Sequence, residues 1–133
     1  MWYMLAADTC ANLLRQPVDG IREKLSAMPA EAMAISALTL GELHHTLEKR
    51  LSPELTSGAI GLFLEHVKAL PWDQEAATAY GRLRCMLEQQ GTPLSPLDVL
   101  TAAHAISRRC VLVTGNTRQF SLVPTLQVES WKQ

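Results

Sequence analysis

Three carboxylates occupy positions from which they could act together. Asp8 directly follows the apolar run 2–7, Glu42 begins a helical segment after the apolar run 33–37, and Asp98 begins another helix. Carboxylates that share a crevice repel one another, so at least one pKa rises unless a cation neutralises them. Carboxylate oxygens without a nearby thiolate or a clear histidine partner suit a hard divalent ion, Mg²⁺ or Mn²⁺. Such an ion polarises a phosphate and activates water against a phosphodiester bond.

Each acid also has a purely structural interpretation. Asp8 could cap the helix that follows it. Glu42 comes three residues after Thr39, which is the spacing of a capping box, and Asp98 stands in the same relation to Ser95. Taken singly, each acid fits a capping role better than a catalytic one. Their joint placement favours a metal site, and a capping acid can serve both purposes.

The elements that must position these acids alternate along the chain. Apolar runs predict buried strands at 2–7, 33–37 and 110–114, with shorter strands at 67–70 and 126–128. Amphipathic or capped segments predict helices between the strands. In the first half these are 9–15, a segment carrying Ile21, Leu25 and Met28 after a break at Pro17, Asp19 and Gly20, and a helix that Thr39 opens and that ends near Arg50. The next helix is capped by Ser52, begins at Pro53 and has a core stripe of Leu55, Ile60, Phe63, Leu64 and Val67; a long helix over 73–90 ends at Gly91, and the last helix is capped by Ser95 and begins at Pro96.

This alternation predicts an α/β fold. Strands separated by helices pair in parallel, with helices on both faces, so we expect a three-layer α/β/α domain with a four- or five-stranded sheet. Such sheets bind ligands at the carboxyl ends of their strands, where the three acids would converge.

Composition narrows the class of protein. The 133 residues suit one domain, 1–133, and 47% of them are apolar. No apolar run has the length of a membrane span, and the first residues lack a signal-peptide pattern, so we expect a cytoplasmic protein without membrane attachment. The net charge of −1 requires any RNA-binding surface to be local. The three cysteines, Cys10, Cys85 and Cys110, have no metal-binding spacing and are expected to fill core space.

Several stretches together resemble one family. The segments LAADTC, ISALTLGEL, ALPWD, MLEQQGTPLSPLDVLTAAHA, LVTGNTRQF and LQVESW resemble, in this order, the VapC-type toxins of the PIN-domain ribonuclease family. The resemblance implies a metal-dependent endoribonuclease toxin of a type II toxin–antitoxin system, acting on a structured RNA such as a tRNA. It also implies a homodimer and a toxin–antitoxin hetero-oligomer in which a VapB-type antitoxin neutralises the nuclease.

The resemblance assigns roles to individual residues. Its catalytic and metal-binding acids are Asp8, Glu42 and Asp98, and its supporting hydroxyl and amide positions are Thr114 and Asn116. The family's fourth acid falls on Gln119. Glutamine lacks the charge and the second equivalent ligand oxygen, so we expect reduced metal occupancy and reduced activity.

Other polar residues carry weaker expectations. Arg82 and Arg84 lie on the long helix that can line the substrate groove in this family, and Arg118 follows the late strand, so these three are RNA-binding candidates. The histidines His44, His45 and His104 lie on helices behind the acids and are expected at the surface or in the core rather than on the metal. Cys10 replaces a common asparagine of the family, and no basic residue is placed in sequence to activate it as a nucleophile.

Two alternatives to the nuclease interpretation are open. The first is a PIN-fold module that binds RNA or antitoxin and cleaves weakly or not at all because Gln119 replaces the fourth acid. The second is a phosphoacceptor receiver-like domain, which is disfavoured because no lysine follows the strand at 110–114. We further expect an apolar groove for the antitoxin among the Ala- and Leu-rich helices, and a homodimer contact through helices of the second half.

Overall fold

The computed structural model describes residues 2–27, 32–50 and 53–131. The strands are β1 (Tyr3–Leu5), β2 (Met33–Ser36), β3 (Lys68–Leu70), β4 (Val111–Val113) and β5 (Val128–Glu129). The helices are α1 (Ala7–Leu14), α2 (Val18–Ser26), α3 (Ala37–Lys49), α4 (Ser57–His66), α5 (Gln74–Gln90), α6 (Pro96–Ser107) and α7 (Thr117–Phe120). All five predicted strands have a counterpart. The first four strands are shorter than predicted, and β5 shares only Val128 with the predicted strand 126–128 and ends at Glu129.

The five strands form one parallel sheet in the order β3-β2-β1-β4-β5. β1 is central, and Tyr3 pairs with Met33 of β2 on one side and with Val111 of β4 on the other. The first and last thirds of the chain therefore meet at the middle of the sheet. The α/β prediction with a parallel sheet is confirmed.

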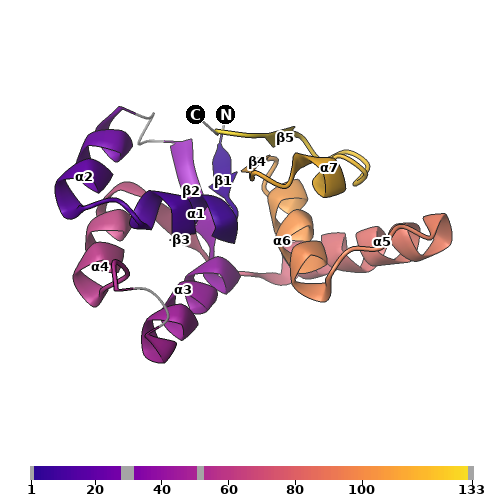
Figure 1. Cartoon of the computed structure of the whole chain (residues 1–133). Coiled ribbons are helices and arrows are strands. Elements are labelled where there is room, and N and C mark those ends of the chain that lie inside the picture. Colours follow the sequence, from indigo (N-terminus) through magenta and orange to yellow (C-terminus); the bar gives the residue numbers. More distant parts are fainter. Residues whose placement is uncertain (1, 28–31, 51–52, 132–133) are drawn as a thin grey trace.

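Alternate residues of each strand pack against different helices. Leu5, Ile35 and Val113 join a core formed with α1, α2, α3 and α4. Their neighbours, among them Met4 and Leu112, join a second core with α5, α6 and α7. This period of two is the geometry of a strand buried on both faces. Figure 1 shows the two groups of helices on opposite sides of the sheet, as the three-layer prediction requires.

Helix starts differ from the prediction in the first half of the chain. α2 begins at Val18, directly after Pro17, so the predicted chain break at Asp19 and Gly20 lies inside a helix. Proline has no N–H to leave unsatisfied and fixes the backbone for a helix entrance, so it stops the preceding segment and starts the next without a longer loop.

The predicted caps of two further helices are also wrong. Ser36 is the N-cap of α3, because its side chain accepts a hydrogen bond of 3.1 Å from the Leu38 backbone N–H. Thr39 is instead a buried residue of that helix. Thr56 caps α4 through the Ala59 N–H at 3.1 Å, while Pro53 lies in a turn. The predicted cap Ser52, like Met28 of the α2 stripe, lies outside the described residues.

The second half follows the prediction closely. Asp73 caps α5 through the Ala76 N–H at 3.0 Å, and Gly91 ends the helix in the left-handed conformation with φ of 68°. Ser95 caps α6, whose first residue is Pro96. Trp72 donates from Nε1 to the carbonyl of Leu100 at 3.0 Å and ties the α5 entrance to α6.

Cysteine and histidine burial is mixed. Cys10 and Cys110 are buried as predicted, whereas Cys85 is exposed on α5, so its predicted core role is wrong. His44 and His45 are solvent-exposed. Desolvation lowers the pKa of the buried His104, against an opposing effect of Asp73.

Of the helices in the described ranges, none combines the length and the apolar character that a bilayer crossing requires.

Candidate active site

The three acids meet at one cavity of about 250 Å³ at the carboxyl ends of β1, β2 and β4. Its lining is Ala6, Ala7, Asp8, Glu42, Leu97, Asp98, Thr101, Thr114, Asn116 and Phe120. The acids come from α1, α3 and α6, which lie far apart in the sequence. The convergence that the strand-and-helix order predicts is therefore present, and Thr114 and Asn116 belong to the same cavity.

Asp8 is held by the end of β4 and does not cap α1. The N-cap position of α1 is Ala6, which makes no side-chain cap. The Asp8 carboxylate accepts a hydrogen bond of 3.0 Å from the Thr114 hydroxyl and one of 2.7 Å from the Gly115 N–H. The backbone N–H of Asn116 in turn donates to Oγ1 of Thr114 at 3.0 Å. This chain of bonds fixes the Asp8 carboxylate at the cavity wall.

Glu42 has a raised pKa, as expected for one of several acids that share a site. It is half-buried on α3, and desolvation raises its pKa, with the charge of Asp98 raising it further. Like charges that share a site disfavour each other's ionisation. The repulsion predicted from the sequence is therefore present between Glu42 and Asp98.

Asp98 combines the capping position with the cavity. Its backbone N–H donates to Oγ of Ser95 at 3.2 Å, which fixes the first turn of α6. The residue also lines the cavity. A well-capped helix start thus places a carboxylate at the edge of the sheet, and the two roles coexist.

Cys10 stands behind the acids in the core. Burial raises the pKa of its thiol, and the charges of Asp8 and Glu42 raise it further. The thiol donates a long hydrogen bond of 3.9 Å to the Leu5 carbonyl. A protonated, buried thiol is a poor nucleophile, as the sequence predicts.

Gln119 stands outside the cavity lining. It is exposed on the short helix α7, and its Oε1 accepts a hydrogen bond of 2.6 Å from Nδ2 of Asn116. The one acceptor atom of the glutamine side chain is therefore engaged by a neighbouring amide.

The donor set fits a hard divalent cation that keeps part of its water. Across residues 2–27, 32–50 and 53–131, no three His, Cys, Asp or Glu side chains are close enough to hold a metal ion by themselves. The expected cage of three carboxylates is thus not preassembled. Mg²⁺ needs only one or two carboxylates and retains several waters, and the unfavourable charge that Glu42 and Asp98 share is what such an ion would relieve.

Two of the three candidate RNA-binding arginines lie away from this cavity. Arg84 forms an exposed pair with Glu88 at 3.4 Å and donates to the Tyr80 hydroxyl at 3.1 Å. It lines a separate small hollow on the α5 side of the molecule. Arg82 is exposed on the same helix, whereas Arg118 on α7 adjoins Gln119. None of the three arginines lines the acidic cavity, and only Arg118 lies on a helix, α7, that contributes a lining residue, Phe120.

Sequence reasoning missed the contribution of Gly115. Its functional group is a backbone N–H, which any residue except proline provides, so side-chain chemistry gives no signal. The only available signal is its place directly after the strand 110–114.

Comparison with known proteins agrees with the fold. Residues 8–125 match the PIN domain family. The chain is 36% identical to the "tRNA(fMet)-specific endonuclease VapC" of Salmonella typhimurium, covering 97% of both chains. It is 30% identical to "Ribonuclease VapC2" of Rickettsia felis, covering 98% of both.

Solved structures give the same result. The DNA-bound VapBC complex of Salmonella typhimurium contains a chain with a TM-score of 0.87 and 35% identity, with 99% of each chain covered. The VapBC2 complex of Rickettsia felis, bound to a DNA fragment from the promoter, contains one with a TM-score of 0.86 and 31% identity, covering 99% of this chain and 100% of the other.

The chain therefore belongs to the PIN-domain family. Within that family it is a VapC-type endoribonuclease toxin, which confirms the resemblance inferred from the sequence. Nucleases of this kind generally depend on a divalent metal. The named relatives are ribonucleases, so they give no support to the alternative of a non-cleaving binding module.

Proposed function

We propose that this toxin hydrolyses phosphodiester bonds of a structured RNA such as a tRNA, with Mg²⁺ held by Asp8, Glu42 and Asp98. The observation that carries the proposal is the cavity that the three carboxylates share, where burial and the charge of Asp98 raise the pKa of Glu42. The relative from Salmonella typhimurium is named for a tRNA, which supports the substrate class. Cytoplasmic action follows from this substrate.

The cation and the side chains of the cavity would have different roles in the reaction. A divalent cation bound there supplies a positive charge that stabilises the phosphate in the transition state and lowers the pKa of water. Thr114 and Gly115 hold the Asp8 carboxylate in one orientation, so it need not reorganise during the reaction. Glu42 and Asp98 would hold the cation, whose charge would offset the burial and the repulsion that raise the pKa of Glu42 in the metal-free protein.

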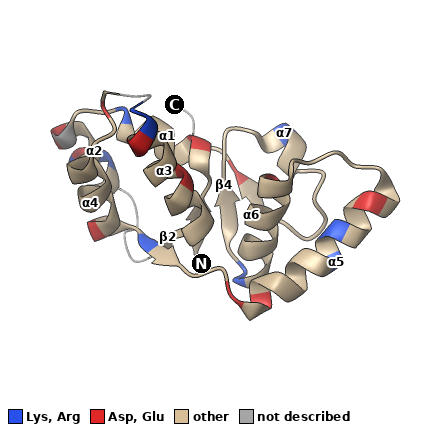
Figure 2. Cartoon of the chain, turned by 90° about the horizontal axis from the view of Figure 1, so that it is seen from below, with Lys and Arg blue, Asp and Glu red and all other residues tan. Residues whose placement is uncertain are grey.

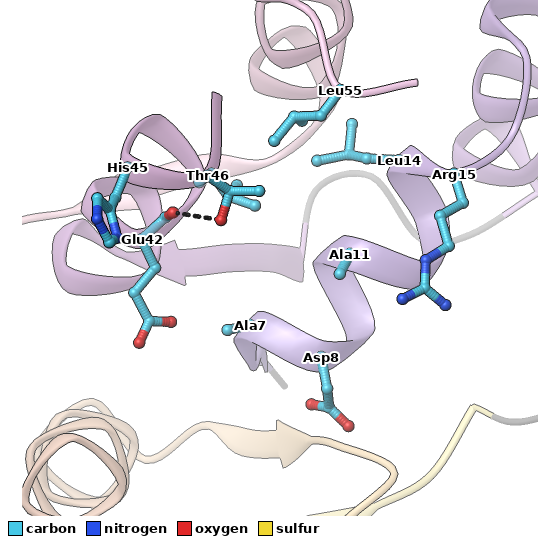
Figure 3. Close-up of a pocket in the computed structure, with 10 residues that line it drawn as sticks. Ala7, Asp8, Ala11, Leu14, Arg15, Glu42, His45, Thr46 and Leu55 are labelled. Atoms are coloured by element: carbon cyan, nitrogen blue, oxygen red, sulfur yellow. Dashed lines mark hydrogen bonds between the residues drawn. The ribbon is translucent and has the colours of Figure 1, made fainter. Parts of the chain in front are cut away.

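We propose that a VapB-type antitoxin covers an apolar hollow next to this cavity. The hollow has a volume of about 560 Å³ and lies between α1, α3 and the entrance to α4, with Leu14, Leu43 and Leu55 in its wall (Figure 3). Asp8 and Glu42 belong to both spaces. An inhibitor segment seated there would exclude RNA from the acids, and the two solved relatives are complexes of VapB with VapC.

We also propose a homodimer that uses the second-half helices. Met86 on α5 and Leu97 on α6 each have 38% of their surface exposed, which is high for large apolar side chains. α5 extends away from the sheet (Figure 1), where a second copy could pack against it. The toxin–antitoxin complex would then be a hetero-oligomer.

A cleavage assay on the purified protein tests the nuclease proposal. Total tRNA and initiator tRNA are incubated with Mg²⁺, with Mn²⁺ or with EDTA, and the Asp98→Asn variant serves as the control. We expect cleavage that needs a divalent ion and is lost in Asp98→Asn. Cleavage in EDTA would contradict the metal role. RNA binding without cleavage by the unmodified chain would support the binding-module alternative and overturn the proposal.

A further inference from the structure

A second hollow lies on the other side of α1. It has a volume of about 480 Å³ and is bounded by α1, α2 and the segments that follow β4 and β5. Its side chains that can bind a ligand are Asn12, Arg15, Gln16, Lys24 and Trp131, and Gly115 completes its wall.

The charge of this hollow is opposite to that of the acidic cavity. Its described lining carries two cations, Arg15 and Lys24, and includes neither aspartate nor glutamate. Arg15 directly follows α1, and Lys24 lies in the last turn of α2. Figure 2 colours the basic residues of the chain blue and the acidic residues red. Nη1 of Arg15 donates to Oδ1 of Asn12 at 3.3 Å, which orients the guanidinium. Two cations without a carboxylate among them attract an anionic ligand.

Trp131 adds a flat apolar surface to these cations. Its ring packs against Tyr3, with centroids 5.5 Å apart and planes inclined by 54°, and its Nε1 donates to Oε1 of Glu129 at 3.3 Å. The ring is half-buried, so part of it faces the hollow. An aromatic ring held in place beside cations is the arrangement on which unpaired bases stack while their phosphates are neutralised.

The hollow and the acidic cavity share no described lining residue, but their walls are joined at the end of β4. Gly115 lines the hollow, and its N–H donates to the Asp8 carboxylate at 2.7 Å. Thr9, the residue after Asp8, also lines the hollow. A strand of RNA bound over Asp8 therefore reaches the hollow by passing Gly115.

We propose that this hollow binds the single-stranded RNA that flanks the cleaved bond. Trp131 stacks on a base, and Arg15 and Lys24 contact the phosphates on either side of it. This inference rests on the proposed nuclease function, since it names the place where that enzyme holds its substrate. Stacking and phosphate contacts carry little base specificity, so the hollow contributes affinity and the direction of the strand.

Binding measurements on a non-cleaving background test the proposal. Fluorescence anisotropy records the affinity of the Asp98→Asn protein for a labelled single-stranded RNA at several salt concentrations. Lys24→Gln and Arg15→Gln remove one cation each, and Lys68→Gln is the matched control, because Lys68 is exposed at the start of the edge strand β3. Trp131→Leu removes the aromatic surface and keeps an apolar side chain against Tyr3.

We expect each cation variant to weaken binding and to reduce the slope of log affinity against log salt by about 0.7, the value for one phosphate contact on a single strand. Trp131→Leu should weaken binding roughly fivefold to hundredfold, as loss of one stacked base does. It should also remove the part of the RNA-induced quenching of tryptophan fluorescence that comes from Trp131, and leave only that of Trp2 and Trp72. The Lys68→Gln protein should keep the affinity and the slope of the background.

Three results would overturn the proposal. The first is that Lys24→Gln and Arg15→Gln bind RNA as Lys68→Gln does. The second is that the quenching is undiminished in Trp131→Leu. The third is that an acidic peptide displaces RNA through the same residues and with the same affinity, which would make the hollow a protein-binding site.

The cleavage assay separates this inference from the nuclease proposal. Normal cleavage with no effect of the cation variants refutes the hollow alone. If the unmodified chain does not cleave RNA but its RNA binding still depends on Lys24, the proposed nuclease function is refuted. The hollow then binds RNA, but not as part of a nuclease.

Discussion

Asn116 donates a hydrogen bond of 2.6 Å from Nδ2 to Oε1 of Gln119, at the position where the family resemblance expects a fourth acid. The backbone N–H of the same asparagine is bonded to Thr114, which in turn donates to Asp8. A single chain of hydrogen bonds therefore links the uncharged Gln119 to a candidate metal ligand. A change in charge at Gln119 acts on the site through this chain as well as through space.

Gln119→Glu should strengthen divalent-metal binding and raise the cleavage rate. The variant places a negative charge at the rim of the cavity and still accepts the Asn116 hydrogen bond, now as a charge-assisted one. Partners that orient a metal ligand typically change metal affinity by about 10-fold or more, so we expect an increase of about that size. Titration with Mn²⁺ and initial cleavage rates measure it.

Gln127→Glu is the matched control for this change. Gln127 is exposed just before β5, and the glutamate of this variant adds the same charge away from the cavity lining. Equal gains in both variants would mean that overall charge, and not the fourth-acid position, limits the enzyme.

The order of strands and helices was predictable because each buried strand is a run of apolar residues between polar ones. The run at 110–114 and the capped start at Ser95 carry strong local signals, and the structure has β4 and α6 there. The start of α3 was predicted too late, because the Thr39 and Glu42 spacing resembles a capping box. Ser36 is the N-cap of α3, because it ends the buried strand β2 and its side-chain oxygen accepts a hydrogen bond from the N–H of Leu38.

The order of strands and helices predicted where the acids of the candidate site lie, and the family resemblance named Thr114 and Asn116, but the hydrogen bonds that hold Asp8 were not predictable. Parallel strands place their carboxyl ends at one edge, which is enough to bring Asp8, Glu42 and Asp98 together. The bonds to Asp8 from Thr114 and Gly115 cross more than 100 residues of sequence. They depend on the pairing of β1 with β4, which no local pattern reveals.

The metal-free protein should lose stability as the pH rises above the ordinary glutamate range. The folded-state pKa of Glu42 is raised from its usual value of 4.5, so the native state binds its proton more tightly than the unfolded state does. The contribution of this group is therefore complete below pH 4.5 and is lost as the pH rises through the folded-state pKa. Thermal unfolding in EDTA, followed across this range, measures the effect.

Glu42→Gln should remove this part of the pH dependence, and excess Mg²⁺ should reduce it in the unmodified chain. Glu48→Gln, on the same helix and exposed, serves as the control. A pH profile unchanged by Glu42→Gln would show that another group is responsible.

Thr114→Val should lower both stability and activity. The valine keeps the shape of threonine but leaves the Asn116 N–H without its acceptor and removes one of the two donors to Asp8. We expect a loss of about 1–3 kcal/mol in the free energy of unfolding and a fall of about 10- to 100-fold in metal affinity.

Thr78→Val provides the comparison for Thr114→Val. The Thr78 hydroxyl is exposed and bonds only to the Gln74 carbonyl of its own helix. Denaturant unfolding and Mn²⁺ titration of both variants should separate an effect on the site from the general cost of losing a hydroxyl. Equal losses of stability and of Mn²⁺ affinity in the two variants would contradict the supporting role of Thr114.

Ala11→Glu should release the toxin from its antitoxin without unfolding it. Ala11 is half-buried on α1 and lines the apolar hollow next to the acids (Figure 3). A carboxylate there, even one paired with Arg15 one turn later in the same hollow, must lose its water when an apolar segment covers it, so the affinity for a VapB-type antitoxin should fall by at least about 10-fold. Calorimetric titration measures the affinity, with the exposed Ala77→Glu of α5 as the control. Unchanged antitoxin binding would place the inhibitor elsewhere.

Ser95→Ala and Ser95→Asp together separate the two roles of the α6 start. Ser95→Ala removes the acceptor of the Asp98 N–H and should cost about 1 kcal/mol in the free energy of unfolding. Ser95→Asp restores the cap but adds a negative charge three residues before Asp98. If the cap matters only for folding, Ser95→Asp should match the unmodified chain in stability and in Mn²⁺ affinity. If Asp98 depends on the cap for its position, Ser95→Ala should weaken Mn²⁺ binding beyond its effect on stability, and Ser95→Asp should recover it. Equal Mn²⁺ affinity in all three proteins would show that the first turn of α6 holds Asp98 in place without its serine.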